Sequence, residues 1–128
     1  MPVKFDEDIF VRLTNLAKKS AMSHKHGAII VRNNEIIAEG INHMAPFLMH
    51  KYSVHAEVDA LYKVRNKSKK FLEDCTLLVV RIGPSSRNYE FKMSKPCKNC
   101  SEAIVKSGIK RVFYSISDDI ATLHGFFM

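Results

Sequence analysis

Apolar positions in the first part of the chain follow a helical spacing. Over residues 5–20 they recur every three or four positions, with acidic residues in the first turn and lysines in the last. Acidic groups are favoured near the N-terminus of a helix and basic groups near its C-terminus. The pattern therefore predicts an amphipathic helix, whose apolar face consists of Phe5, Ile9, Leu13, Leu16 and Ala17.

Two short aliphatic runs follow the predicted helix. Residues 27–31 and 36–41 have the composition of strands, and the polar stretch Arg-Asn-Asn-Glu at 32–35 separates them. Two strand-like runs joined by a polar turn predict an antiparallel hairpin. Residues 42–54 show neither the spacing of a helix nor that of a strand, so we expect irregular structure there.

The second half of the chain alternates helical and strand-like segments. We expect a helix at 56–66, a buried strand at 75–82, a polar loop at 83–95, a helix at 98–107 ended by Gly108, a strand at 111–115, and a short final helix capped at 117–119. This order predicts an α/β sandwich with parallel crossovers between the later strands.

Size and composition fit one globular domain spanning residues 1–128. The chain has 128 residues, of which 46% are hydrophobic and 26% charged, enough for a core without disulfide bonds. It contains no apolar run of about 18 residues, so we expect no membrane span. The N-terminal segment lacks the basic-then-apolar order of a secretory signal, which favours a cytoplasmic protein.

Cysteine usage indicates metal or redox chemistry. The chain has three cysteines, an odd number that cannot form a closed set of disulfides. Cys97 and Cys100 form a C-x-x-C pair, whereas Cys75 opens an apolar run and is expected to be a buried core thiol.

The net charge of +7 suits a phosphate-bearing partner, either a free nucleotide or a nucleic acid. The alternative is a solvated helix end, where cations are also favoured. The charge is concentrated at Lys63, Arg65, Lys67, Lys69 and Lys70, and again at Lys92, Lys95 and Lys98.

Two segments carry the candidate chemistry, and each lies where a predicted helix begins. One holds His55 and Glu57; the other holds Cys97 and Cys100, directly after Pro96. Proline suits a helix entry because the first turn needs no amide donor. If both helices pack on one sheet, the histidine and the two cysteines meet. They form a zinc set whose fourth position is open for water.

Glu57 follows His55 by two residues, close to the predicted metal without being a ligand. Zinc lowers the pKa of bound water towards about 7, and a nearby carboxylate can move its proton. This H-x-E…P-C-x-x-C arrangement is the signature of zinc deaminases. The alternative is a closed structural zinc site, with His43 or His50 as fourth ligand.

The chain resembles the cytidine and deoxycytidylate deaminase superfamily over most of its length. The stretches that carry the resemblance are 27–31, 40–42, 55–57, 96–100 and 108–114. The resemblance implies a three-layer α/β/α sandwich with a mixed sheet of four to five strands. It also implies an active site at the start of the second and third helices.

The same resemblance implies a reaction and its residues. An exocyclic amino group is removed hydrolytically from a base, with Glu57 transferring protons. The backbone amides of Ala56 and Cys97 lie near the base carbonyl and the attacking hydroxyl. Asn42 contacts the sugar or base; the alternative for Asn42 is a strand-end turn residue.

Several positions depart from the family pattern. A Gly-Ile-Asn-His stretch at 40–43 replaces the Gly-Tyr-Asn-Gly typical of deoxycytidylate deaminases, which puts triphosphate regulation in question. His43 and His50 could belong to a substrate loop, hold a second metal, or be surface residues. Few residues follow Tyr114, so we expect the fifth strand to be absent or reduced to Phe126 and Phe127. Family members commonly assemble, so we expect a homodimer or homotetramer.

Four functions remain open at this point. The leading hypothesis is a zinc-dependent deaminase of cytidine, deoxycytidine or dCMP, in nucleotide metabolism and pyrimidine salvage. The second is a deaminase of adenosine or cytosine in nucleic acid, such as tRNA, although the chain has no Trp for base stacking. The third is a guanine- or pterin-type deaminase. The fourth is a non-catalytic zinc-binding module.

Overall fold

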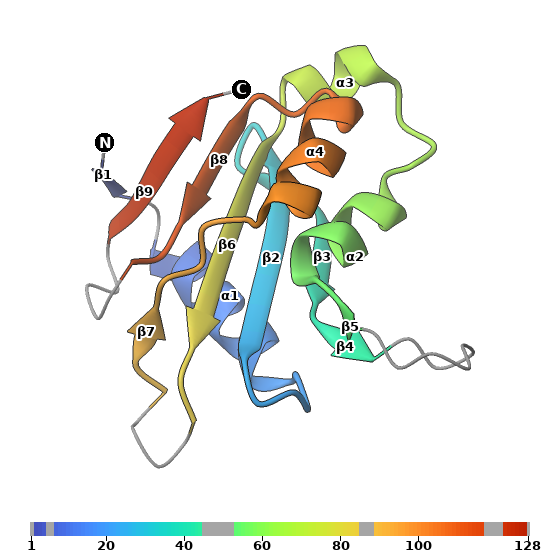
Figure 1. Cartoon of the computed structure of the whole chain (residues 1–128). Coiled ribbons are helices and arrows are strands. Elements are labelled where there is room, and N and C mark those ends of the chain that lie inside the picture. Colours follow the sequence, from blue (N-terminus) through green and yellow to red (C-terminus); the bar gives the residue numbers. More distant parts are fainter. Residues whose placement is uncertain (1, 5–6, 45–52, 85–88, 117–121, 128) are drawn as a thin grey trace.

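A mixed β-sheet with helices on both faces forms the protein in the computed structural model (Figure 1). The structure describes residues 2–4, 7–44, 53–84, 89–116 and 122–127. The sheet has the strand order β1-β9-β8-β6-β2-β3, and β7 pairs with the end of β6. Its strands are β1 (Pro2–Lys4), β2 (Lys25–Arg32), β3 (Glu35–Ile41), β6 (Thr76–Ile82), β7 (Phe91–Lys92), β8 (Arg111–Tyr114) and β9 (Thr122–Phe127).

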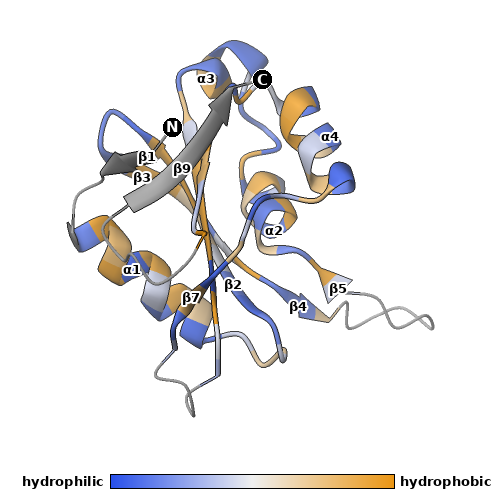
Figure 2. Cartoon of the chain, turned by 60° about the vertical axis from the view of Figure 1, so that its left-hand side comes forward, coloured by the Kyte–Doolittle hydropathy of each residue, from blue (hydrophilic) through white to orange (hydrophobic). Residues whose placement is uncertain are grey.

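Helices cover the two faces of this sheet unequally. They are α1 (Glu7–Lys18), α2 (Ala56–Lys63), α3 (Lys69–Glu73) and α4 (Lys98–Ser107). Figure 2 shows α1 on one side of the sheet, with α2 and α4 on the other. Each interface contains its own buried apolar cluster, one built around Leu13 and Leu78, the other around Ala60, Leu77 and Ile104.

The predicted three-layer sandwich is thus confirmed, with a mixed sheet of five longer strands and two short ones. The hairpin of β2 and β3 is antiparallel, and its turn places Asn33 and Asn34 at φ 51° and 65°. Asparagine tolerates this left-handed region better than most residues. Strands β6 and β8 are parallel, and α4 makes the crossover between them. Gly108 ends α4 at φ 104°, as expected for a left-handed helix cap.

Several short elements differ from the sequence-based expectation. The predicted loop at 83–95 contains β7, and the irregular segment at 42–54 contains a small antiparallel pair, β4 (His43–Met44) and β5 (Ser53–Val54). The fifth longer strand, β9, forms in full and pairs with β8 and β1. Strands β1 and β7 and helix α3 are too short for periodicity to reveal. The predicted final helix at 117–119 lies outside the described residues.

A glycine on β3 lets α2 lie close to the sheet. A Cβ atom on Gly40 would lie 2.3 Å from the Ala56 carbonyl oxygen and 2.6 Å from the Ala60 nitrogen. Any side chain would therefore push away the first turns of α2, where His55 and Glu57 are placed.

None of the helices in the described segments is both long enough and apolar enough to cross a membrane.

Candidate metal centre and adjoining cleft

His55 and Cys97 occupy equivalent places, each as the N-cap of a helix on the same face of the sheet. His55 precedes α2 and Cys97 precedes α4, both with extended backbone, and neither side chain makes a capping hydrogen bond. An N-cap side chain usually accepts a bond from the first-turn amides. These two side chains are instead turned to each other, and this orientation leaves their donor atoms available to a ligand.

The three predicted zinc ligands come together in the structure. The ligand atoms of His55, Cys97 and Cys100 all lie within 4.8 Å of one another. His55 Nδ1 is 3.1 Å from Cys100 Sγ and 3.7 Å from Cys97 Sγ. Tetrahedral zinc with ordinary bond lengths separates such N and S atoms by about 3.6 Å. Among the described residues this is the one cluster of His, Cys, Asp and Glu that could hold a metal.

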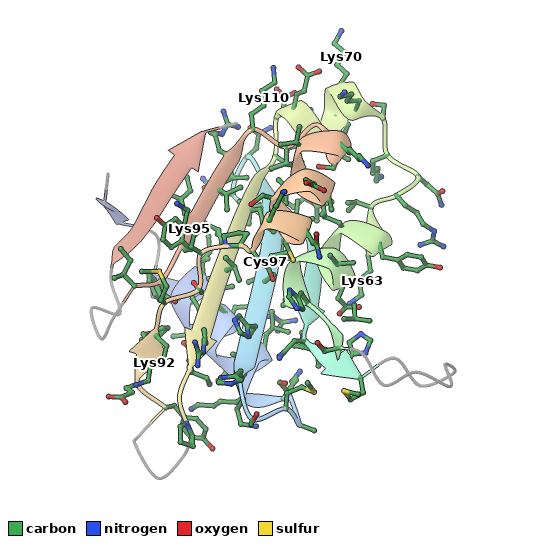
Figure 3. The ribbon with its side chains drawn as sticks, in the orientation of Figure 1. Lys63, Lys70, Lys92, Lys95, Cys97 and Lys110 are labelled. Carbon is green, nitrogen blue, oxygen red and sulfur yellow. The ribbon has the colours of Figure 1, made fainter. Side chains whose placement is uncertain are left out.

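The donor set suits zinc chemically as well as geometrically. One imidazole and two sulfurs are soft ligands, and three protein ligands leave a fourth position for water. Cys100 is buried, and burial together with the nearby Glu57 charge raises the pKa of its thiol. A zinc ion would replace the thiol proton and offset this cost. His55 and Cys97 are exposed, so the metal position faces solvent. Figure 3 shows Cys97 where α4 begins.

Glu57 lies buried beside these ligands. It is the second residue of α2 and is only 3% exposed. Burial raises the pKa of its carboxyl group, while hydrogen bonds to its own backbone amide and to Cys100 act in the opposite direction. Ala56 is the first residue of α2, where the amide has no partner within the helix.

A cleft of about 330 Å³ opens next to these side chains. Small-molecule sites commonly have volumes of roughly 300–1,000 Å³, so this cleft is small. Its lining joins residues from α2, α4 and several strand ends: Met22, Ser23, His24, His26, Asn42, Ser53, His55, Glu57, Arg81, Ser94, Lys95 and Cys97.

Asn42 lines the cleft and also fixes the segment that precedes β2. Its side-chain oxygen accepts a hydrogen bond of 2.9 Å from the His26 amide, and its side-chain nitrogen donates to the His24 carbonyl. The residue is 6% exposed. The geometry thus contains features of both predicted roles, a strand-end turn residue and a cleft residue; the substrate contact stays a prediction.

Three cleft residues with titratable or charged side chains were not among the sequence-based candidates: His24, His26 and Arg81. The signal for Arg81 was present, since it is a lone charge inside the apolar run of β6. His24 and His26 stand on either side of Lys25, the first residue of β2. Two histidines at this spacing indicate no particular function until the pairing of β2 with β6 is known.

The other described candidates do not belong to the metal cluster. His43 Nε2 is 3.3 Å from an Asp59 carboxylate oxygen, and His50 lies outside the described residues. The basic residues at 63–70 do not line the cleft, and Figure 3 shows Lys70 well away from Cys97. Cys75 is fully buried in the apolar cluster, as predicted.

Residues 3–116 match the family model described as the cytidine and deoxycytidylate deaminase zinc-binding region. The chain is 35% identical to a tRNA-specific adenosine deaminase from Buchnera aphidicola subsp. Baizongia pistaciae (strain Bp) over 88 residues, which is 69% of this chain and 46% of that protein. It is 33% identical to the tRNA-specific adenosine deaminase of Aquifex aeolicus (strain VF5), covering 72% of this chain and 52% of that one. The chain therefore spans about half the length of these curated relatives.

Solved structures of similar fold include dCMP deaminase from cyanophage S-TIM5 and cytidine deaminase from Burkholderia pseudomallei. The first has a TM-score of 0.58 at 24% identity, covering 91% of this chain and 89% of that chain. The second has a TM-score of 0.66 at 14% identity, covering 96% and 93%. At these identities the likeness establishes the fold.

Proposed function

Since the chain belongs to the cytidine and deoxycytidylate deaminase zinc-binding family, we propose that residues 1–128 act as a single zinc-dependent deaminase domain. The proposed reaction is hydrolytic: a base carrying an exocyclic amino group and water give the oxo base and ammonia. The observation that carries this proposal is the buried Glu57 carboxylate beside a three-donor metal site at the wall of a cleft. A purely structural zinc site has no use for such a carboxylate.

Each site residue has a proposed role. His55, Cys97 and Cys100 would hold zinc, which supplies Lewis-acid chemistry that makes water acidic near neutral pH. Glu57 takes the proton of the attacking water and returns it to the base and the departing amino group. The amides of Ala56 and Cys97 orient the base carbonyl and the incoming oxygen, and Asn42 holds the sugar or base.

We propose a cytosine nucleoside or nucleotide as substrate: cytidine, deoxycytidine or dCMP. The small volume of the cleft supports a single nucleotide or nucleoside as its occupant. Conversion of a cytosine to a uracil compound would place the protein in nucleotide metabolism, within pyrimidine salvage.

A nucleic-acid substrate is the second candidate, and the curated relatives favour it. Two tRNA-specific adenosine deaminases are more than 30% identical to this chain. The net charge of +7 suits binding to a polyanion. This candidate keeps the metal ligands and Glu57 in the same roles and changes only the carrier and the base.

An ammonia-release screen separates these candidates. Zinc-loaded protein is incubated with cytidine, deoxycytidine, their monophosphates, adenosine, guanine and a short RNA, at two salt concentrations. We expect release from a cytosine nucleoside or nucleotide with little dependence on salt. Release from RNA alone, falling steeply with salt, would replace the first candidate with the second.

Replacing the proposed proton carrier tests the enzyme class itself. Glu57→Gln keeps the size of the side chain but removes its basic group, so turnover should fall about 10²- to 10⁴-fold. Zinc content should stay near one per chain, because Glu57 is not a ligand. Glu102→Gln changes an exposed glutamate on α4 and serves as the matched control. Unchanged ammonia release in E57Q would contradict the proposal.

We also propose a cytoplasmic homodimer or homotetramer. The metal site needs two reduced cysteines, which supports a reducing compartment. Large apolar side chains are exposed on the outer helices, namely Val58 and Tyr62 on α2 and Val105 on α4, which supports contact with a second copy. Light scattering coupled to size exclusion would measure the mass directly.

A further inference from the structure

The lining of the cleft includes basic side chains, among them Arg81, which lies near the end of β6. In the sheet Arg81 pairs with His26 of β2 on one side and with Lys92 of β7 on the other. Paired residues of antiparallel strands place their side chains on the same face. His26 and Arg81 both line the cleft, whereas Lys92 does not.

The strand periodicity puts Arg81 on the same face as the metal ligands. Leu77 and Val79 precede Arg81 by four and two positions, and both belong to the apolar cluster beneath α2 and α4. Side chains two apart on a strand share a face. Arg81 therefore follows the last core residue of that row and extends into the cleft.

The Arg81 guanidinium is held in place but incompletely satisfied. One terminal nitrogen donates a 2.5 Å hydrogen bond to His24 Nδ1, which orients the planar group. Its Nε is buried and has no hydrogen-bond partner among the described residues. Because Nε is shielded, a ligand in the cleft would meet the terminal nitrogens, which carry two N–H groups each and use one of them for His24. Within the described segments, no carboxylate forms an ion pair with Arg81.

The backbone around Arg81 is rigidly anchored. Its amide donates to the Ser115 hydroxyl at 3.2 Å, and the Ser94 and Ser115 hydroxyls are 2.8 Å apart. Both serines are buried. Ser94 directly precedes Lys95, whose side chain lines the cleft on the segment leading to Cys97 (Figure 3).

Charge in the cleft also favours an anion. Among the described residues that line the cleft, Glu57 is the one acidic residue, and it lies next to the metal ligands. Arg81 and Lys95 are the permanent cations among the same residues. Guanidinium groups bind phosphate through paired N–H donors, and the terminal nitrogens of Arg81 offer such donors beside the bond to His24.

We propose that Arg81, assisted by Lys95, binds a phosphate group attached to the sugar of the base being deaminated. The inference rests on the proposed function for the position of the base, and it makes Arg81 the residue that selects a phosphorylated substrate over a nucleoside. The phosphate can belong to a free nucleoside monophosphate or to an oligonucleotide backbone, because both present the same oxygens.

Calorimetric titration of the zinc-loaded protein tests this without relying on turnover. The probes are deoxycytidine, dCMP, a short single-stranded RNA and inorganic phosphate. Wild-type protein should bind a phosphate-bearing probe more tightly than deoxycytidine. In Arg81→Gln the affinity for that probe should fall about tenfold or more, the usual effect of losing a charge-assisted bond.

Lys92→Gln is the matched control, because it removes one positive charge from the paired position on β7. Lys92 lies outside the cleft lining and pairs with Glu90 at 2.8 Å, so its loss should leave the affinities unchanged. Arg81→Lys keeps the charge without the planar set of guanidinium donors and should retain part of the affinity. Circular dichroism on all variants verifies that they are folded.

The outcomes separate the two proposals. Loss of dCMP and phosphate binding in R81Q supports a free nucleotide, and loss of RNA binding alone supports an oligonucleotide; both support the subsite. Equal affinities of wild type and R81Q for every phosphate-bearing probe, or an equal loss in K92Q, would overturn it. Failure of the deaminase proposal appears instead as no ammonia release from any base.

Discussion

Asn42 uses both ends of its side-chain amide to hold the backbone at the start of β2. The bonds to the His26 amide and the His24 carbonyl fix the segment that brings both histidines to the cleft. The backbone of Asn42 takes part as well, since its carbonyl accepts from the Ser20 hydroxyl at 3.0 Å. Asn42, which directly follows the last residue of β3, thus holds the wall of the cleft in place through its hydrogen bonds.

Replacing Asn42 should therefore weaken both stability and substrate binding. Asn42→Ala leaves two half-buried backbone groups without these partners, which costs about 1–3 kcal/mol of unfolding free energy. Urea denaturation measures that loss, and KM should rise because the cleft wall shifts. Asn66→Ala, at an exposed loop position, should stay within about 0.5 kcal/mol of wild type. Equal stability of the two variants would contradict this role.

His26 should make stability fall in mild acid. Burial lowers the pKa of His26 from 6.5 to about 4. Between these pH values the unfolded chain binds a proton that the folded chain does not, so stability decreases as pH falls from about 6.5 towards 4. The full effect is on the order of 3 kcal/mol at most.

The His26→Gln variant isolates this contribution. Unfolding free energies of wild type and H26Q are compared at pH 7 and pH 5, so that metal loss in acid affects both proteins alike. Wild type should lose about 2 kcal/mol more than the variant over this range. Parallel losses in the two proteins would assign the acid sensitivity to other groups.

At the residue scale, the sequence predicts what local spacing controls. His55, Glu57, Cys97 and Cys100 stand out because their spacing within short segments already indicates metal chemistry, and the structure brings the three ligands together. Arg81 and His26 become neighbours only through the pairing of β2 with β6. That register depends on long-range packing, so no local pattern reveals it.

At the scale of elements, two glycines set how closely the helices approach the sheet. Gly40 faces α2, and Gly27 faces α1, where an added Cβ would lie 2.8 Å from the Leu13 carbonyl oxygen. Gly27 lies on the inner strand β2 and Gly40 on the edge strand β3. Of the two helices that they face, only α2 has a metal ligand at its start. The two positions therefore form a matched pair for separating fold effects from site effects.

Gly40→Ala should reduce zinc affinity as well as stability. The new methyl group would displace the start of α2 and with it His55, so zinc affinity should fall by about tenfold or more. Gly27→Ala should cost a similar amount of stability, about 1–3 kcal/mol or more, with zinc affinity retained. Competition with a chromogenic chelator measures the affinities. Equal zinc affinities in the two variants would contradict the prediction.

Element prediction succeeded where segments were long and failed where they were short. The apolar spacing of α1 and the aliphatic runs of β2 and β6 are each several residues long and sufficient to identify them. Helix α3 and strand β7 have five and two residues, and their stability comes from contacts with the rest of the fold. The sequence predicts a fifth strand that is absent or reduced to Phe126 and Phe127, whereas β9 has six residues. Its length depends on pairing with β8 and β1, which no local pattern indicates.

At the scale of the whole molecule, two apolar clusters on opposite sides of the sheet hold the layers together. The order of elements was enough to predict a sandwich, because a helix between parallel strands must cover the sheet. The strand order, with β6 between β2 and β8, follows from no local pattern. That order nevertheless decides the site, since it sets α2 and α4 side by side with their N-termini converging.

Zinc would add a cross-link between distant parts of this molecule, from the start of α2 to the start of α4. A ligand that binds only the folded state stabilises it, by about 4 kcal/mol when its concentration is a thousand times its dissociation constant. Chelation should therefore lower the melting temperature by on the order of 10 °C.

Cys97→Ser and Cys100→Ser should lose this sensitivity to chelator, because each removes a ligand. Cys75→Ala removes a buried thiol away from the site and should keep it, although the variant melts at a lower temperature. A wild-type melting temperature that chelator leaves unchanged would mean that the fold is independent of the metal, and the ligands would then serve chemistry alone.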